Sequence, residues 1–172
     1  MEKIVALTQN SLRENFNADE VHILLVADKP ARAASRKGSA KDKEKAKSEK
    51  AAATRVAAAQ RRKLNAVEGL KVVPHTDKSI ELFAELFESG QTSCGMPNAD
   101  QLACFVGKEY SNIASAALIP LFHERQLGVV MLTSKDESRF SSGKGVMFLN
   151  QLGELLGRRL HTYGAFAPAK TK

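Results

Sequence analysis

The sequence contains little cysteine, and its histidines are few and scattered. Its two cysteines, Cys94 and Cys104, are too few for a disulfide framework and lie too far apart for a zinc knuckle. The four histidines show no spacing typical of metal ligands. We therefore expect no disulfide, no metal ion and no cofactor.

Long apolar runs are also missing. No stretch approaches the roughly 20 apolar residues that a membrane-spanning helix needs. Residues 1–16 lack the apolar core of a secretory signal peptide. Together with the low cysteine content, these absences predict a reduced, cytoplasmic protein. The 172 residues are enough for one domain with a sizeable core.

The net charge of +7 arises from one segment. Residues 29–63 hold 13 of the 26 Lys and Arg residues and only three acids, so this segment carries +10 and the remainder −3. We read residues 29–66 as a basic, low-complexity insertion without aromatic residues. Its charge alone could bind nucleic acid or an anionic membrane; the alternative is a solvated surface segment. Its lack of apolar anchors predicts that residues 31–55 are mobile.

Hydrophobic periodicity predicts an α+β fold. The apolar strands of a central hairpin have nonpolar residues on both sides, which indicates a sheet covered on both faces. We expect sequential strands to pair in an antiparallel sheet, with the two terminal helices packed together on one face. In chain order, the predicted elements are a helix at 1–16, strands at 20–28 and 70–74, a helix at 77–90, an extended piece at 91–95, a short helix at 96–107, strands at 113–122 and 126–134, and a helix at 142–161.

Three segments, in this order, resemble a known family. They are "LFESGQTSCGMPNADQLACFVG", "SAALIPL" and "RFSSGKGVMFLNQLGELLGRRL". The hairpin and the last helix resemble the C-terminal half of a GAF domain, and the finer pattern resembles the bacterial GAF-like proteins of domain-of-unknown-function family 484. The resemblance covers residues 1–28 and 67–162 and omits the basic insertion.

The resemblance implies a fold and a class of function. The fold is a single GAF-like domain over residues 1–172, with a central antiparallel sheet, the terminal helices on one face, and short helices over a ligand pocket on the other. The function is non-catalytic binding of a small molecule or a protein partner in a signalling or regulatory role. GAF-like domains often form homodimers through their terminal helices, which predicts a homodimer here. The resemblance does not name the ligand.

The pocket is expected between the sheet and residues 93–105. Short helices over a sheet leave cavities more readily than long ones, and ligand pockets combine apolar walls with a few polar groups. No charged cluster is expected there, so the ligand should be neutral or weakly charged. The alternative is that Phe83, Phe87 and Phe105 fill this space. The predicted ligand-binding residues are Ser93, Cys94, Asn98, Gln101, Leu102, Phe105, Ser115 and Leu118.

Cys94 supports an alternative function. Some GAF-like enzymes reduce free methionine sulfoxide with cysteines in this region, so the resemblance also allows a thiol-dependent enzyme or redox sensor that uses Cys94. Such chemistry needs a thiolate and usually a resolving cysteine within reach, for which Cys104 is the candidate. The competing interpretation is a buried structural thiol. We expect no catalytic residue.

Two glycines on the last predicted helix, Gly153 and Gly157, are four residues apart. Each costs about 1 kcal/mol of helix propensity relative to alanine, so this spacing indicates a close approach to a partner. That partner is either the N-terminal helix of the same chain or the same helix of a second chain.

Overall fold

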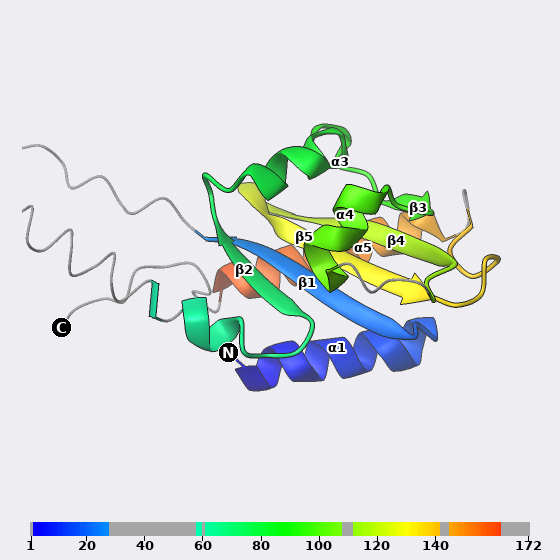
Figure 1. Cartoon of the computed structure of the whole chain (residues 1–172), viewed down its shortest axis with the longest axis horizontal. Coiled ribbons are helices and arrows are strands. Elements are labelled where there is room, and N and C mark those ends of the chain that lie inside the picture. Colours follow the sequence, from blue (N-terminus) through cyan, green and yellow to red (C-terminus); the bar gives the residue numbers. More distant parts are fainter. Residues whose placement is uncertain (1, 28–57, 60, 108–111, 142–144, 163–172) are drawn as a thin grey trace, which may run out of the picture.

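The computed structural model describes residues 2–27, 58–59, 61–107, 112–141 and 145–162. Within these residues, one five-stranded sheet has helices on both faces, which confirms the predicted α+β class (Figure 1). The elements are α1 (Glu2–Phe16), β1 (Glu20–Ala27), β2 (Leu70–Pro74), the 3₁₀ helix η1 (Lys78–Phe83), α3 (Ala84–Ser89), β3 (Ser93–Gly95), α4 (Ala99–Val106), β4 (Ser115–His123), β5 (Arg125–Ser134) and α5 (Val146–Thr162).

The sheet is mixed, with the strand order β2-β1-β5-β4-β3. The pairs β1–β5, β5–β4 and β4–β3 are antiparallel, as predicted, but β1 and β2 are parallel. The expectation of a fully antiparallel sheet of sequential strands was therefore wrong. A parallel pair needs a crossover connection of about a dozen residues or more, and residues 28–69 are long enough to supply it.

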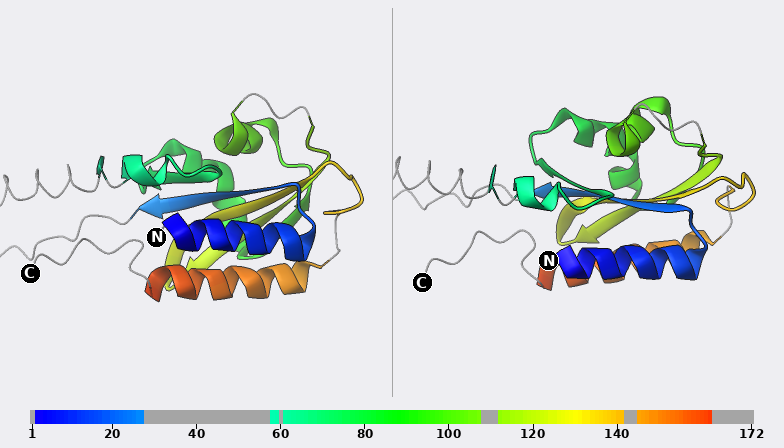
Figure 2. Two further views of the ribbon diagram at one scale, coloured as in Figure 1. Left: turned by 90° about the horizontal axis from the view of Figure 1, so that it is seen from below. Right: turned by 60° about the horizontal axis from the view of Figure 1, so that its bottom comes forward.

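The terminal helices α1 and α5 lie side by side and antiparallel on one face of the sheet, which confirms their predicted placement (Figure 2). They cover a core that includes Leu12, Ile119 and Leu149. The other face carries η1, α3 and α4 over a second cluster, centred on the fully buried Phe83. Adjacent residues of a strand point to opposite faces, so each central strand contributes to both cores.

Helix α5 lies unusually close to β4. A Cβ atom at Gly153 would lie 2.7 Å from the Pro120 carbonyl oxygen, and one at Gly157 would lie 2.3 Å from the Phe122 carbonyl oxygen. The close approach that the glycine spacing predicted is therefore made to the sheet. It is made neither to α1 nor to a second chain.

The short helices begin and end at the residues that the sequence favours. The Asp77 carboxylate caps η1 by accepting a hydrogen bond from the Ser79 amide, and Gly90 ends α3 in the left-handed conformation. Asn98 caps α4 in a reciprocal pair with Gln101. These caps set where the short helices begin and end.

The C-terminal end of the predicted basic insertion packs against the domain. Residues 61–64 are helical, Leu64 is buried in the core beneath α1, and Asn65 bonds to β2. The expected mobility of residues 31–55 concerns a segment that lies outside the described residues.

Candidate functional site

The sheet divides the predicted ligand-binding residues between its two faces. Cys94 pairs with Ala117 and, like it, packs into the core beneath α1 and α5. Leu102 and Leu118 belong to the core on the opposite face. Ser93, next to Cys94 on the strand, is exposed. The structure therefore does not bring these residues together around one space.

Three predicted polar residues hold the backbone in place. Ser115, which is buried, donates through Oγ to the Asp136 carbonyl oxygen at 2.6 Å and so anchors the loop after β5. Asn98 accepts from the Gln101 amide at 2.8 Å as the cap of α4. Gln101 also donates through Nε2 to the Leu82 carbonyl oxygen at 2.8 Å, which ties α4 to η1. A ligand contact for these residues stays a prediction.

Apolar side chains fill the space between α4 and the middle of the sheet. Leu102 and Phe83 are almost completely buried there, and Phe87 is buried with them. The Phe105 ring packs edge-on against Phe83 at a centroid distance of 5.6 Å. This arrangement agrees with the filled-core alternative for that region.

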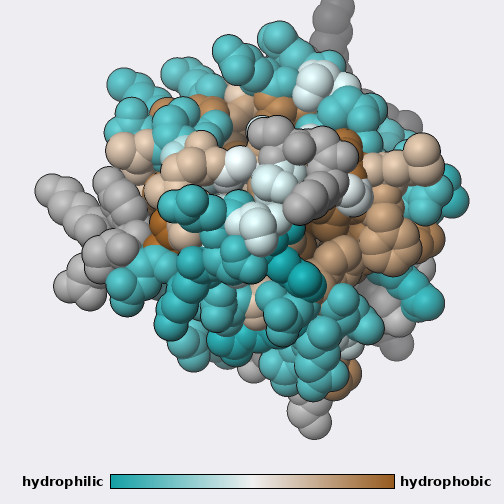
Figure 3. Space-filling model, turned by 90° about the vertical axis from the view of Figure 1, so that its right-hand side faces the viewer, coloured by the Kyte–Doolittle hydropathy of each residue, from teal (hydrophilic) through white to brown (hydrophobic). Residues whose placement is uncertain are grey.

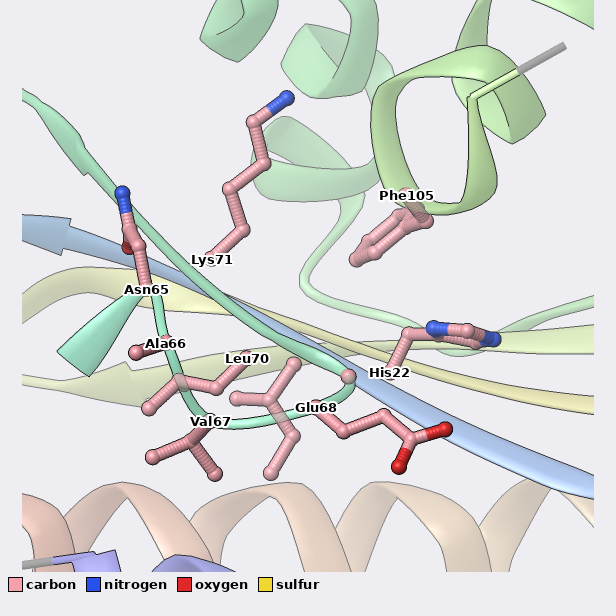
Figure 4. Close-up of a pocket in the computed structure, with 10 residues that line it drawn as sticks. His22, Asn65, Ala66, Val67, Glu68, Leu70, Lys71 and Phe105 are labelled. Atoms are coloured by element: carbon pink, nitrogen blue, oxygen red, sulfur yellow. The ribbon is translucent and has the colours of Figure 1, made fainter.

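A cavity of about 280 Å³ lies nearer the β2 edge of the sheet, beside α4 (Figure 4). This volume is close to the lower end of the range of small-molecule sites. Phe105 is the one predicted site residue that contributes to it. The lining residues are His22, Ile23, Asn65, Ala66, Val67, Glu68, Gly69, Leu70, Lys71 and Phe105.

Lys71 lines this cavity from β2. It pairs with Leu24 of β1, so its side chain leaves the sheet on the α4 face. Its Nζ donates to the Cys104 carbonyl oxygen, in the last turn of α4, at 2.8 Å. A cation is favourable at a helix C-terminus, because the last carbonyl groups carry partial negative charge. Lys71 therefore links the edge strand to α4.

His22 lines the cavity from β1, beneath Phe105 (Figure 4). Its Nε2 lies 2.9 Å from a carboxylate oxygen of Glu20. A carboxylate at neutral pH only accepts hydrogen bonds, so this bond places a proton on Nε2. The rings of His22 and Phe105 are tilted, with centroids 6.3 Å apart. The two rings give the cavity an aromatic wall.

The segment from Asn65 to Gly69 is held by hydrogen bonds. Asn65 accepts from the Val72 amide at 2.6 Å and thus occupies the outer edge of β2. Gln9 of α1 donates to the Glu68 carbonyl oxygen at 3.0 Å. Gly69 has φ +70°, and a Cβ there would lie 2.7 Å from the Val21 carbonyl oxygen, so glycine suits this position. This side of the cavity is therefore preformed.

Comparison with protein-family models matches residues 1–165 to a family described as "Protein of unknown function, DUF484". The chain belongs to this family. No curated protein matches the sequence. In the part of this DUF484 chain that the structure describes, no helix is long and apolar enough to cross a membrane.

The two cysteines of this DUF484 chain are not disulfide-bonded, and they lie on opposite faces of the sheet. Cys94 is partly buried beneath the terminal helices, and this burial raises the pKa of its thiol above the usual 9.0. Cys104 is buried on the other face, with Lys71 Nζ 3.8 Å from its sulfur. Their separation by the sheet provides no route for Cys104 to act as a resolving thiol for Cys94.

Sequence reasoning missed the two charged or polar walls of the cavity in this DUF484 chain. The segment "EVHILLVAD" contains His22 among apolar residues, and "LKVVP" contains Lys71 in the same way. A polar residue within an otherwise apolar strand has to reach a partner or a cavity. A polar residue in each of these apolar strands was visible in the sequence. The sequence does not show on which face of the sheet the His22 and Lys71 side chains lie together.

Proposed function

We propose that this chain is a single, non-catalytic GAF-like domain that binds a small molecule and serves a signalling or regulatory role in the cytoplasm. The cavity bounded by His22, Lys71 and Phe105 is the observation that carries the proposal. Membership of the DUF484 family and the arrangement of α1 and α5 behind the sheet support the GAF-like fold. Contact of the basic insertion with nucleic acid or an anionic membrane stays a prediction from the sequence.

The separation of the cysteines favours binding over thiol chemistry. A methionine sulfoxide reductase of the kind that the sequence suggests needs a reactive thiolate and a second thiol within reach. Burial disfavours the thiolate of Cys94, because it raises the thiol pKa. Cys104 lies across the sheet. Both observations support a structural role for Cys94.

A cavity-filling variant tests the binding proposal. Ala66 lines the cavity and is exposed at its rim, so Ala66→Phe should occupy the space without burying a polar group. We expect a small-molecule library to raise the melting temperature of the wild type and not that of Ala66→Phe. The matched variant Cys94→Leu adds bulk on the opposite face and should keep the response.

The reverse pattern would contradict the cavity assignment. Binding that survives Ala66→Phe but is lost in Cys94→Leu would restore a site beside β3. Native mass spectrometry of the purified protein gives an independent test, because a co-purified small molecule should be displaced by Ala66→Phe.

We also propose a homodimer through α1 and α5. Several large apolar side chains of these helices are exposed, among them Leu7, Phe148 and Leu155. The ring of Phe148 lies 5.7 Å from that of Phe16, so the patch spans both helices. Figure 3, which views the end of the molecule where α5 begins, shows apolar surface gathered on one side. A second copy would remove this surface from water.

Light scattering coupled to size-exclusion chromatography tests the dimer. The double variant Phe148→Glu and Leu155→Glu should be monomeric at concentrations at which the wild type is dimeric. Met96 is an exposed apolar residue outside the two helices, so Met96→Glu is the matched control. A monomeric wild type, or a dimer that only Met96→Glu disrupts, contradicts this interface.

A further inference from the structure

Lys71 brings a half-buried positive charge to the cavity wall. Asp77 lies close enough for the Lys71 ammonium to add, after the hydrogen bonds from Ser79, to the lowering of the Asp77 pKa, but the two groups form no ion pair. The Lys71 Nζ hydrogen-bonds to a carbonyl oxygen and approaches the Cys104 sulfur. Among the described residues, no Asp or Glu forms an ion pair with Lys71. The one acid of the lining, Glu68, points away from the Lys71 ammonium, to the opposite side of β2 (Figure 4).

A partly desolvated ammonium is most stable beside an anion. The helix C-terminus provides only partial negative charge, and the Cys104 carbonyl oxygen and sulfur take two of the three N–H groups of Lys71. The third donor can point to a carboxylate that enters the cavity. A charge-assisted bond of this kind is about twice as strong as a neutral one.

The walls on the α4 side suit a flat ligand. Phe105 and His22 offer two rings there, whereas the side chains of Ile23 and Leu70 belong to the core on the opposite face of the sheet. The volume of about 280 Å³ equals the liquid volume of roughly nine water molecules, at about 30 Å³ each. It therefore accommodates a compact molecule with a single ring.

The net charge around the cavity limits the charge of the ligand. Glu68 is exposed at the lining, and Glu20 is hydrogen-bonded to His22 beside it. Glu20 beside His22 and Glu68 across β2 both add negative charge around the cavity, which disfavours a polyphosphate, while Lys71 attracts one negative charge. We infer that the cavity takes a small aromatic monocarboxylate, whose carboxylate lies at Lys71 and whose ring lies against Phe105. This inference rests on the proposed binding function.

Calorimetric titration with three probes tests the ligand class. We expect benzoate to bind the wild type at least about ten-fold more tightly than benzamide, because only benzoate supplies the charge. Pyrophosphate should bind more weakly than benzoate. Lys71→Met should remove the preference for benzoate, Lys71→Arg should keep it, and Lys78→Met, at an exposed lysine outside the cavity, should leave it unchanged.

The outcomes separate the ligand class from the binding function. If benzamide or pyrophosphate binds as tightly as benzoate and Ala66→Phe blocks it, the monocarboxylate is wrong and the cavity assignment stands. A preference for benzoate that survives Lys71→Met also overturns the inference. If Ala66→Phe blocks the binding of none of the three probes, both the inference and the cavity assignment fail. The wild-type affinity ratio decides the question alone if Lys71→Met does not fold.

Discussion

Replacing Gly157 by alanine tests how closely α5 lies against the sheet. In an isolated helix this change should stabilise by about 1 kcal/mol, because alanine has the higher helix propensity. Here the added Cβ would lie 2.3 Å from the Phe122 carbonyl oxygen, whereas ordinary contact begins at 3.4 Å. The two backbones therefore have to separate by about 1 Å. Neither backbone can yield as a flexible side chain would.

That separation weakens the packing of the whole helix. Leu149 is buried against the sheet, and Leu152, Leu156 and Leu160 pack against the same core. A gap of 0.5–1 Å forfeits about a quarter to a half of the dispersion energy of each contact. Overpacking of this kind typically costs about 1–3 kcal/mol. The clash at 2.3 Å is with backbone, so the upper part of this range, about 2–3 kcal/mol, applies here. After subtraction of the propensity gain of about 1 kcal/mol, we expect a net destabilisation of about 1–2 kcal/mol.

Urea unfolding and thermal unfolding, both followed by far-ultraviolet circular dichroism, measure this change. A loss of 1–2 kcal/mol should lower the melting temperature by roughly 2–8 °C for a chain of this size. Gly153→Ala should cost less, because its closest backbone contact would be 2.7 Å. Gln151→Ala, on the exposed side of α5, controls for helix propensity and should change little. Stabilisation of Gly157→Ala by about 1 kcal/mol would refute the close-packing argument.

Three further predictions concern the sheet edge, acid stability and the thiol. Asn65→Ala should lower the free energy of unfolding by about 1–3 kcal/mol in urea, because it leaves the buried Val72 amide without its acceptor. Light scattering should also show association through the uncovered β2 edge. Unchanged stability would contradict this. Hydrogen bonds from Ser79 hold the pKa of Asp77 below 3.8, so the stabilisation by this carboxylate is full above pH 3.8 and is lost as the pH falls below that value. Asp77→Asn should therefore flatten the curve of stability against pH in the acid range. An unaltered curve would oppose the assignment. Cys94 should react slowly with iodoacetamide at pH 7 and faster only above pH 9, and rapid labelling of the folded protein at pH 7 would favour the redox alternative.

The local elements could be predicted because their signals lie within short segments. The apolar hairpin, the Asn98 cap and the glycine that ends α3 all appear in the structure. The pairing of β1 with β2 could not be predicted in the same way. Strand direction in a sheet depends on how the connection crosses it, and residues 28–69 are long enough for either a parallel or an antiparallel arrangement.

The predicted site residues stay a prediction, but the sequence did not show that the sheet divides them between its two faces. Cys94 lies on the three-residue strand β3, and its face is set by its register with Ala117. A shift of one residue would move it to the opposite face of the sheet. The sequence predicted an extended piece at 91–95 but did not show which strand it pairs with or in which register. Phe105 was identified as a wall residue, but the space around its neighbour Leu102 is filled.

The cavity is created by residues that are far apart in the chain. Lys71 and its hydrogen-bond partner at the end of α4 are 33 positions apart in the sequence. The parallel pairing of β2 with β1 places Lys71 opposite Leu24, on the strand that also carries His22. In an antiparallel arrangement, β2 would run in the opposite direction, and the loop from Asn65 to Gly69 would lie at the other end of β1. The same unpredicted strand direction therefore explains both the error in the sheet and the missed cavity. Binding at this edge would couple β2, α4 and, through Gln9, helix α1, because each already contacts a lining residue.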